Sequence, residues 1–280
     1  MLLDFIKMNG AGNDFVVIDA RKTPISLSLE QVRQLSSRDN AITKGCDQLL
    51  ILRPSKQADV FMQIYNADGG EVDACGNATR CVARLIIKEF DQEDVTVETN
   101  AGLLYCKGVN EDGAVVTVNM EKPKLDWKDI PLSKPMNTLH LDINEGELKD
   151  PVGVSMGNPH AVFFVKDADA INLTELGEKL EHHPLFPKRA NIGVAQIESV
   201  DDAGDISMYL RVWERGCGET KACGTGACAA LVAAHRRRLG GRTATIRTSG
   251  GAILEVEWDK NDDVFLSGFV ETEFVGKIEV

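Results

Sequence analysis

The chain has 280 residues, 43% hydrophobic and 26% charged, which is the composition of a folded globular protein of about two domains. Its net charge of −12 argues against the broad basic surface that binds nucleic acid or an anionic membrane. Seven cysteines, an odd number, do not form the dense framework of a small secreted domain. Because the chain shows neither a basic leader nor a run of ~20 apolar residues, we expect a cytoplasmic protein with reduced thiols.

Short runs of β-type residues recur along the chain and predict that strands dominate both halves. The first run follows a Gly12-Asn13 turn signal, and a run of the same kind follows Gly157-Asn158. The predicted strands cover residues 15–18, 49–52, 95–99, 115–118, 161–165 and 207–213.

Two helices are predicted at equivalent places, each directly after a cysteine. After Cys75, apolar residues recur with the spacing of one helix face. After Cys223, residues 227–234 are small and apolar on every side, which predicts a helix enclosed by other structure. We expect Gly240-Gly241 to end this second helix, and a more exposed helix over residues 173–180.

The two cysteine segments belong to a repeat of about half the chain. Residues 65–76 and 213–224 align without a gap, and both read Gly-Glu and Ala-Cys-Gly at corresponding positions. A repeat of this length is too long for a solenoid and predicts two similar domains. Residues 121–135 are rich in proline and charge, which is typical of a linker.

We therefore expect an α+β fold of two similar domains that arose by internal duplication. Each is predicted to be a curved, mostly antiparallel β-sheet or barrel wrapped around a central α-helix. The predicted domains cover residues 1–119 and 120–267, and the strand over 268–280 is a candidate to return to the first domain.

A cysteine at a helix start is typical of reactive thiols. The positive end of the helix lowers the pKa of a thiol, and we expect this at Cys75 and Cys223. The amides that follow, in Gly76-Asn77 and Gly224-Thr225, are donors for a carboxylate. If equivalent ends of the two domains face one cleft, two thiols approach one ligand from opposite sides.

That arrangement predicts inversion of a carbon stereocentre without a cofactor. A thiolate would remove the proton from one face, and a thiol would return a proton to the other face. His160 and Glu214 are candidates to set the two pKa values.

The other cysteines have simpler interpretations. Cys46, Cys81, Cys106 and Cys228 are expected to be small buried hydrophobes, and Cys217 is expected in a loop. The cysteine spacings and the lack of a spaced histidine pair do not fit a zinc site, so no metal is expected.

Four sequence blocks resemble the diaminopimelate epimerase family. They cover Met8 to Asp19, Asn66 to Asn77, Gly157 to His160, and Glu214 to Cys228, the last being the most specific. The chain departs from the family pattern at Asn9, where His is usual, at Ala74, where Met is usual, and at Ala78, where Gly is usual. We expect no loss of chemistry from Ala78, because alanine suits the first turn of a helix.

The resemblance implies that Cys75 and Cys223 are the acid–base pair that interconverts LL- and meso-diaminopimelate in lysine and peptidoglycan precursor biosynthesis. It implies that His160 and Glu214 tune the cysteines and hold the reacting ammonium group. The substrate-binding residues it implies are Asn13, Gln48, Asn66, Gly76, Asn77, Asn158, Asn191, Arg215, Gly224 and Thr225. It implies a small-molecule substrate and no cofactor, nucleic acid or membrane, and it is compatible with a homodimer.

Three alternatives stay open. A proline racemase-like enzyme would also use paired cysteines, but it would not need Arg215, Asn66 and Asn191 for a distal charged group. An isomerase of the phenazine pathway type is disfavoured by the paired thiols. From another class, the chain could be a thiol redox sensor whose two cysteines form a disulfide.

Overall fold

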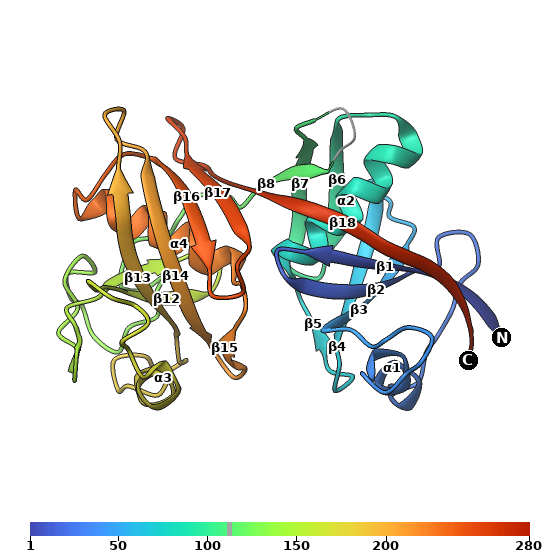
Figure 1. Ribbon diagram of the computed structural model, residues 1–280, viewed down its shortest axis with the longest axis horizontal. Coiled ribbons are helices and arrows are strands. Elements are labelled where there is room, and N and C mark those ends of the chain that lie inside the picture. Colours follow the sequence, from blue (N-terminus) through green and yellow to red (C-terminus); the bar gives the residue numbers. More distant parts are fainter. Residues whose placement is uncertain (111–113) are drawn as a thin grey trace. The chain divides into compact units, whose positions relative to one another are not determined.

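The computed structural model describes residues 1–110 and 114–280, which form two compact units (Figure 1). Unit 1 comprises Met1–Asn119 and Ser267–Val280, and unit 2 comprises Met120–Leu266. The strand β18 (Val264–Glu279) therefore begins in unit 2 and continues in unit 1.

In unit 1 the strands form a closed ring in the order β1-β2-β3-β4-β6-β7-β8-β18, because β18 also pairs with β1. The pairs β2–β3 and β4–β6 are parallel, whereas β1–β2, β3–β4, β6–β7 and β7–β8 are antiparallel. The strands are β1 (Leu2–Gly10), β2 (Asn13–Asp19), β3 (Gln48–Arg53), β4 (Val60–Asn66), β5 (Glu71–Val72), β6 (Asp94–Thr99), β7 (Gly102–Gly108) and β8 (Val115–Asn119).

Unit 2 repeats this pattern in the order β11-β12-β13-β14-β16-β17-β18. The parallel pairs β12–β13 and β14–β16 correspond to β2–β3 and β4–β6, and the short strand β15 pairs with β14 as β5 pairs with β4. The strands are β9 (Asn144–Glu145), β10 (Leu148–Lys149), β11 (Val152–Ser155), β12 (Pro159–Phe164), β13 (Asn191–Val200), β14 (Ile206–Glu214), β15 (Gly218–Thr220), β16 (Thr243–Thr248) and β17 (Ile253–Trp258). The expected fold class, two similar α+β units of curved and mostly antiparallel sheet, is confirmed.

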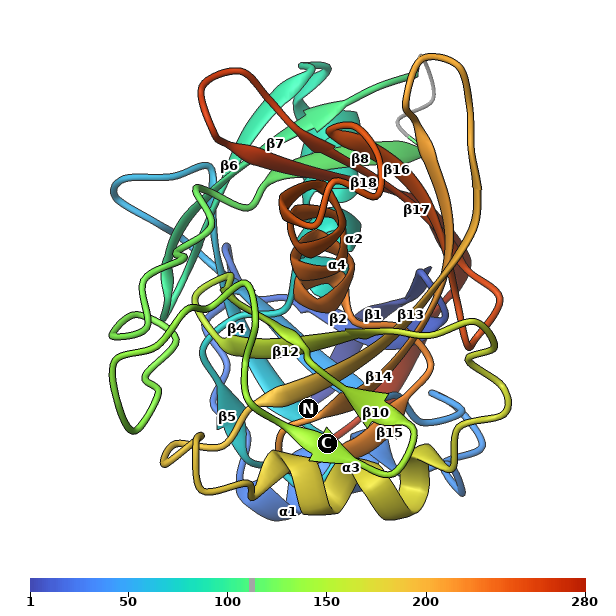
Figure 2. The ribbon, with the colours of Figure 1, turned by 90° about the vertical axis from the view of Figure 1, so that its left-hand side faces the viewer.

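A central helix packs inside the sheet of each unit. In unit 1, α2 (Gly76–Phe90) contacts β1, β4, β6, β7 and β8 and buries the apolar face predicted from its spacing. In unit 2, α4 (Gly224–Arg236) contacts β11 to β14, β16 and β17, and Figure 2 shows β12, β13, β14, β16 and β17 around it. Its alanines are fully buried, because only small side chains let strands approach a helix on all sides.

The predicted end of the second helix is wrong. The helix α4 ends at Arg236, and Arg238 adopts the left-handed conformation at φ 59° that often follows a helix. Gly240 is required for another reason, since a Cβ there would lie 2.4 Å from the Ile206 side chain. The glycine therefore allows the chain to pass close to β14.

Each unit also carries an outer helix. In unit 1, α1 (Leu29–Ser36) packs Val32 and Leu35 against β2 and β3, and Ser28 and Gln31 form a capping box at its start. This helix was not predicted, although the capping box can be read from the sequence. In unit 2, α3 (Leu173–Glu181) matches the expected third helix.

Candidate active site

Cys75 stands immediately before α2, the central helix of unit 1. Its backbone is extended, at φ −150° and ψ 113°, and the residue is half-buried. Because the helix begins at Gly76, the amides of Gly76 and Asn77 have no carbonyl one turn earlier to accept their hydrogen bonds. Such donors at the positive end of a helix suit a carboxylate.

A chain of hydrogen bonds fixes the amide of Asn13 beside this helix start. Asn77 Nδ2 donates to Asn13 Oδ1 at 2.6 Å, and Asn13 Nδ2 donates to Asp47 Oδ2 at 3.1 Å. The buried Arg80 in turn donates to Asn77 Oδ1 at 2.6 Å. These hydrogen bonds orient the Asn13 side chain, and its amide can still make further hydrogen bonds to a ligand.

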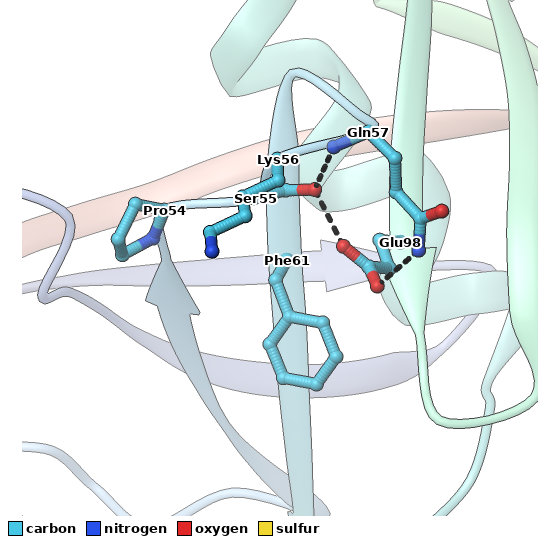
Figure 3. Close-up of a pocket in the computed structure, with 6 residues that line it drawn as sticks. All are labelled: Pro54, Ser55, Lys56, Gln57, Phe61 and Glu98. Carbon is cyan, nitrogen blue, oxygen red and sulfur yellow. Dashed lines mark hydrogen bonds between the residues drawn. The ribbon is translucent and has the colours of Figure 1, made fainter.

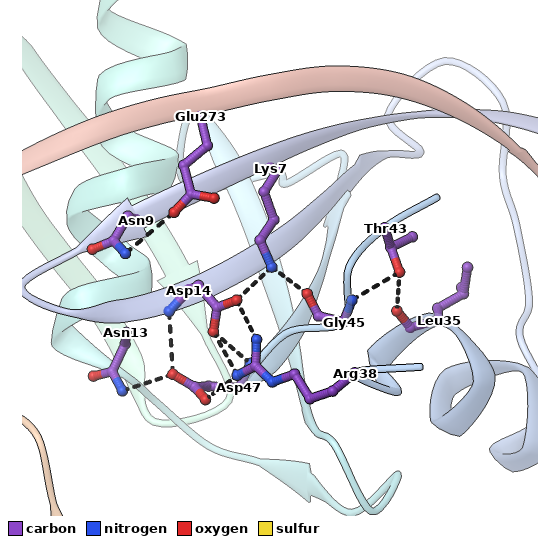
Figure 4. A network of polar contacts seen from close by, with 10 residues as sticks. All are labelled: Lys7, Asn9, Asn13, Asp14, Leu35, Arg38, Thr43, Gly45, Asp47 and Glu273. Atoms are coloured by element: carbon purple, nitrogen blue, oxygen red, sulfur yellow. Dashed lines mark hydrogen bonds and ion pairs between the residues drawn. The ribbon is translucent and has the colours of Figure 1, made fainter. Parts of the chain in front are cut away.

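Asp47 belongs to an ionic network that anchors β2 and the loop before β3 (Figure 4). Arg38 bridges Asp14 and Asp47, and the buried Lys7 pairs with Asp14 and donates to the Gly45 carbonyl. Burial raises the pKa of Asp14, but hydrogen bonds from Arg38 and Lys7 outweigh it and hold that pKa well below its usual range. The sequence did not predict a role for these residues. Lys7 directly precedes the Met8–Asp19 block, Asp14 lies within it, and Asp47 precedes Gln48.

Gln48 and Asn66 are neighbours on paired strands of unit 1. They are opposite each other in the β3–β4 register, and Gln48 Nε2 donates to Asn66 Oδ1 at 3.0 Å. Among the described residues, the buried Gln48 Oε1 finds no hydrogen-bond donor. A buried acceptor of this kind suits the ammonium group of a ligand.

In unit 2, Cys223 stands at the equivalent place before α4 but is buried, with 5% of its surface exposed. Its Sγ accepts a hydrogen bond from the Gly226 amide at 3.3 Å and lies 3.5 Å from Thr225 Oγ1. Burial raises the pKa of the Cys223 thiol well above its ordinary value, and Glu214 raises it further. The expected lowering of this pKa is wrong for Cys223, because lost solvent and a nearby carboxylate outweigh the lowering by the hydrogen bonds with Thr225 and the Gly226 amide.

Glu214 ends β14 next to this cysteine. Its Oε1 accepts a hydrogen bond from Thr220 Oγ1 at 2.5 Å, and its carboxylate also accepts one from the Cys223 thiol. Burial raises the pKa of Glu214, and these two hydrogen bonds oppose the rise. Because a thiolate could not donate to Glu214, this contact favours the thiol form of Cys223.

His160 is fully buried beside the same helix start. Its Nε2 lies 3.0 Å from Asn158 Oδ1, and Asn158 Nδ2 donates to Thr225 Oγ1 at 3.2 Å. Burial, aided by the charge of Arg215, lowers the pKa of His160 to about 3, so the ring stays neutral. Nε2 also lies 3.4 Å from Asn191 Nδ2, and the buried Nδ1 has no hydrogen-bond partner among the described residues.

Asn191 and Arg215 are also brought together in unit 2. The Arg215 amide donates to Asn191 Oδ1 at 2.8 Å, and its guanidinium donates to the Lys188 carbonyl at 3.1 Å. The exposed guanidinium keeps further donors for a planar anion such as a carboxylate.

The predicted residues thus form two groups, one in each unit. The group in unit 1 contains Asn13, Gln48, Asn66, Cys75, Gly76 and Asn77. The group in unit 2 contains Asn158, His160, Asn191, Glu214, Arg215, Cys223, Gly224 and Thr225.

Three of the other cysteines are unsuited to act as a base or a nucleophile. Burial raises the pKa of Cys46, and it raises the pKa of Cys81 and of Cys106 to about 12. A thiol that stays protonated in the core acts as a small hydrophobe.

A surface pocket of about 390 Å³ in unit 1 contains none of the predicted site residues (Figure 3). Its carboxylate, Glu98, already accepts hydrogen bonds from Ser55 Oγ at 2.5 Å and Gln57 Nε2 at 2.6 Å. These neighbours lower the pKa of Glu98, so the charge is satisfied within the protein.

In residues 1–110 and 114–280, no group of three or more His, Cys, Asp or Glu side chains is arranged to hold a metal ion. No helix in this part of the chain is both long and apolar enough to cross a membrane.

The fold is shared with solved structures of low sequence identity to this chain. A Bacillus anthracis phenazine biosynthesis protein of the PhzF family superposes with a TM-score of 0.67 over 100% of both chains, at 18% identity. A probable proline racemase from Agrobacterium radiobacter superposes with a TM-score of 0.65 over 99% of this chain and 93% of the other, at 17% identity. These similarities define the class of fold, two barrel-like units each built on a central helix.

The chain belongs to the diaminopimelate epimerase family, and so to the isomerases. The family model matches residues 5–125 and 152–272. The diaminopimelate epimerase of Rhodospirillum centenum is 49% identical over 99% of this chain and 93% of its own length. That of Acidiphilium cryptum is 47% identical over 98% of this chain and 96% of its own length. The resemblance inferred from the four sequence blocks is confirmed.

Proposed function

We propose that this protein interconverts LL- and meso-2,6-diaminopimelate by a two-base mechanism that needs no cofactor. The observation that carries the proposal is that the central helix of each unit starts at a cysteine, followed by amides that lack helical acceptors. Membership of the diaminopimelate epimerase family supports this substrate over proline. The reaction requires both sulfurs to reach one α-carbon.

In one direction Cys75 is the base and Cys223 the acid. The Cys75 thiolate removes the α-proton, and the electron pair passes into the α-carboxylate. Cys223 then donates its S–H proton to the opposite face of the carbon, leaving Cys75 as the thiol and Cys223 as the thiolate. The raised pKa of Cys223 and its hydrogen bond to Glu214 support the thiol as its starting form. The reverse reaction begins with the opposite protonation states.

The helix-start amides stabilise the charge that develops on the reacting carboxylate. The amides of Gly76-Asn77 and Gly224-Thr225 are already aligned by their helices, so they need no reorganisation as the intermediate forms. The Nδ1 atom of neutral His160 has no hydrogen-bond partner among the described residues, and as an acceptor it would receive a hydrogen bond from the reacting ammonium group.

Side chains from both units recognise the rest of the substrate. Arg215 offers a planar fork to the distal carboxylate, and Gln48 Oε1 offers a buried acceptor to an ammonium group. The amides of Asn13, Asn66, Asn158 and Asn191 add both donors and acceptors. A substrate without the distal amino acid end would leave such groups unpaired and is expected to be rejected.

In the cell this activity would serve lysine and peptidoglycan precursor synthesis in the cytoplasm, and a homodimer is compatible with it. Under this proposal a disulfide between the two cysteines only inactivates the enzyme. The redox-sensor alternative predicts the opposite, that oxidation creates the functional state, so activity measured before and after adding reductant separates the two.

The decisive experiment is turnover of LL-diaminopimelate in heavy water. Solvent deuterium is expected at the α-carbon of the product, because the proton returned comes from a thiol that exchanges with solvent. A parallel assay with L-proline is expected to show no racemisation. Retention of the original α-hydrogen through many turnovers, or racemisation of proline in preference to diaminopimelate, would contradict the proposal.

A further inference from the structure

Glu181 is a buried carboxylate in unit 2 whose position needs an explanation. It is the last residue of α3, and 2% of its surface is exposed. A negative charge at the C-terminal end of a helix opposes the helix dipole, and burial removes its hydration. Glu181 therefore does not stabilise α3. The reason for a buried glutamate at this position must lie in its hydrogen-bond partners.

Two of those partners lie close together, one at the end of β14 and one in the turn that leads from β14 to β15. Glu181 Oε2 accepts a hydrogen bond from Trp213 Nε1 at 2.8 Å, and Oε1 accepts one from the Gly216 amide at 3.0 Å. Arg189 adds a longer contact at 3.4 Å. The two close donors come directly before and directly after Glu214-Arg215, so the carboxylate clamps the turn on both sides.

The packing of α3 determines which way Trp213 points. A Cβ at Gly177 would lie 2.6 Å from the Trp213 ring, so only glycine lets the indole lie against the helix. Gly177 and Glu181 are one turn apart on the same helix face. The indole that packs on Gly177 therefore reaches Glu181 with its N–H group, and α3 contacts both β14 and β15 (Figure 2).

The same turn is held from β13. The Arg215 amide donates to Asn191 Oδ1, and the Cys217 amide donates to the Glu214 carbonyl at 3.0 Å. Gly216 has φ 78°, a conformation that glycine adopts readily. Backbone hydrogen bonds thus shape the turn, and Glu181 ties it to the outer helix.

We propose that Glu181 is a positioning residue that holds Arg215 in its binding geometry, whereas Glu214 is fixed separately by Thr220. The kinetic effect expected from this role rests on the proposed function, in which Arg215 binds the distal carboxylate of the substrate. Glu181 itself acts through the Trp213 and Gly216 hydrogen bonds and makes no contact with substrate.

The test is the variant Glu181→Gln, with Glu178→Gln as the matched control. Glutamine keeps the size of the side chain but turns one acceptor oxygen into a donor, so one of the two N–H groups loses its partner. Glu178 is on the same helix and is exposed, so its variant makes the same charge change without touching the turn.

We expect Glu181→Gln to raise KM for diaminopimelate about tenfold while kcat changes less than about threefold, because binding at the distal end is the same in substrate and transition state. Glu178→Gln is expected to match the wild type. A KM for Glu181→Gln within twofold of the control would overturn the proposal. If wild type and control both fail to turn over diaminopimelate, the proposed function fails instead.

Two further measurements keep the inference testable. Exchange of the Gly216 amide with solvent, followed by NMR, is expected to be faster in Glu181→Gln than in the control whether or not the enzyme acts on diaminopimelate, and equal exchange would overturn the inference. If Glu181→Gln does not fold, Trp213→Phe keeps the aromatic ring but removes the N–H donor. It should raise KM about threefold, and an unchanged KM would count against the proposal.

Discussion

The two helix starts carry the same repeat but surround their cysteines differently. At α4 the sulfur of Cys223 is buried and accepts the Gly226 amide, whereas the half-buried Cys75 at α2 forms no such capping hydrogen bond. Cys223 also has the carboxylate of Glu214 beside it, which raises its pKa. The two helix starts thus share their sequence repeat but differ in the burial of the sulfur and in its capping hydrogen bond.

One position explains much of this difference. Ala78 in α2 corresponds to Gly226 in α4 within the repeat. A Cβ at Gly226 would lie 3.2 Å from Cys223 Sγ and 3.0 Å from the Val212 side chain. The glycine therefore lets Cys223 fold back over its helix start, while unit 1 accommodates alanine at the corresponding place.

Removing either sulfur is the strongest test of the comparison. We expect Cys75→Ala and Cys223→Ala each to lower kcat for epimerisation by about 10³-fold or more, since each removes one of the two proposed proton-transfer groups. Both variants should keep the circular dichroism spectrum of the wild type. Cys217→Ala, at an exposed position, is the control and should retain full activity. Substantial epimerisation by either variant would show that its cysteine is dispensable.

Adding one methyl group in unit 2 is expected to have the next largest effect. Gly226→Ala should lower kcat/KM about 10²-fold, because the new Cβ displaces Cys223 Sγ from its place and small displacements of reacting groups are costly. Steady-state kinetics and the rate of Cys223 alkylation would report the displacement. Wild-type kinetics in this variant would mean that the site tolerates the methyl group.

Acid should destabilise unit 2 before unit 1. The folded state holds the pKa of His160 near 3, below its ordinary 6.5, so the unfolded chain binds a proton that the folded chain does not as the pH falls below 6.5. This costs about 2 kcal/mol of unfolding free energy between pH 7 and pH 5. In unit 1 the pKa of Asp14 is lowered. Its contribution to the free energy of unfolding is therefore kept until the pH falls below the ordinary pKa range of a carboxyl group.

Urea denaturation of the wild type and of His160→Gln at pH 7 and pH 5 measures this contribution. The variant is expected to lose about 2 kcal/mol less than the wild type over that interval. An equal loss in both proteins would mean that another group causes the pH dependence.

The smallest effect is expected from the reverse change in unit 1. Ala78→Gly should lower the free energy of unfolding by about 1 kcal/mol, because glycine is a poor helix former, and should leave kcat and KM within about twofold. Thermal denaturation and steady-state kinetics would check both parts. A large loss of activity would show that Ala78, unlike its counterpart, supports the chemistry directly.

The sequence alone was sufficient for the features that are local or repeated. The fold class and the family were predicted from the two apolar helix patterns, the cysteine before each helix and the internal repeat. These features depend only on short-range periodicity and on repeated sequence. The helix α1 was not predicted, although Ser28 and Gln31 form a capping-box pattern that indicates a helix start. The roles of the individual site residues stay predictions.

Only the tertiary structure decided what depends on distant segments meeting. The contact of Asn13 with Asp47, the clamp of Glu181 on Trp213 and Gly216, and the crowding at Gly226 join residues that no local pattern relates. The direction in which the pKa of Cys223 shifts also depends on distant segments. A helix start can be recognised in a sequence, but the solvent that a side chain loses and the charge that comes to lie beside it are set only when the whole unit has packed.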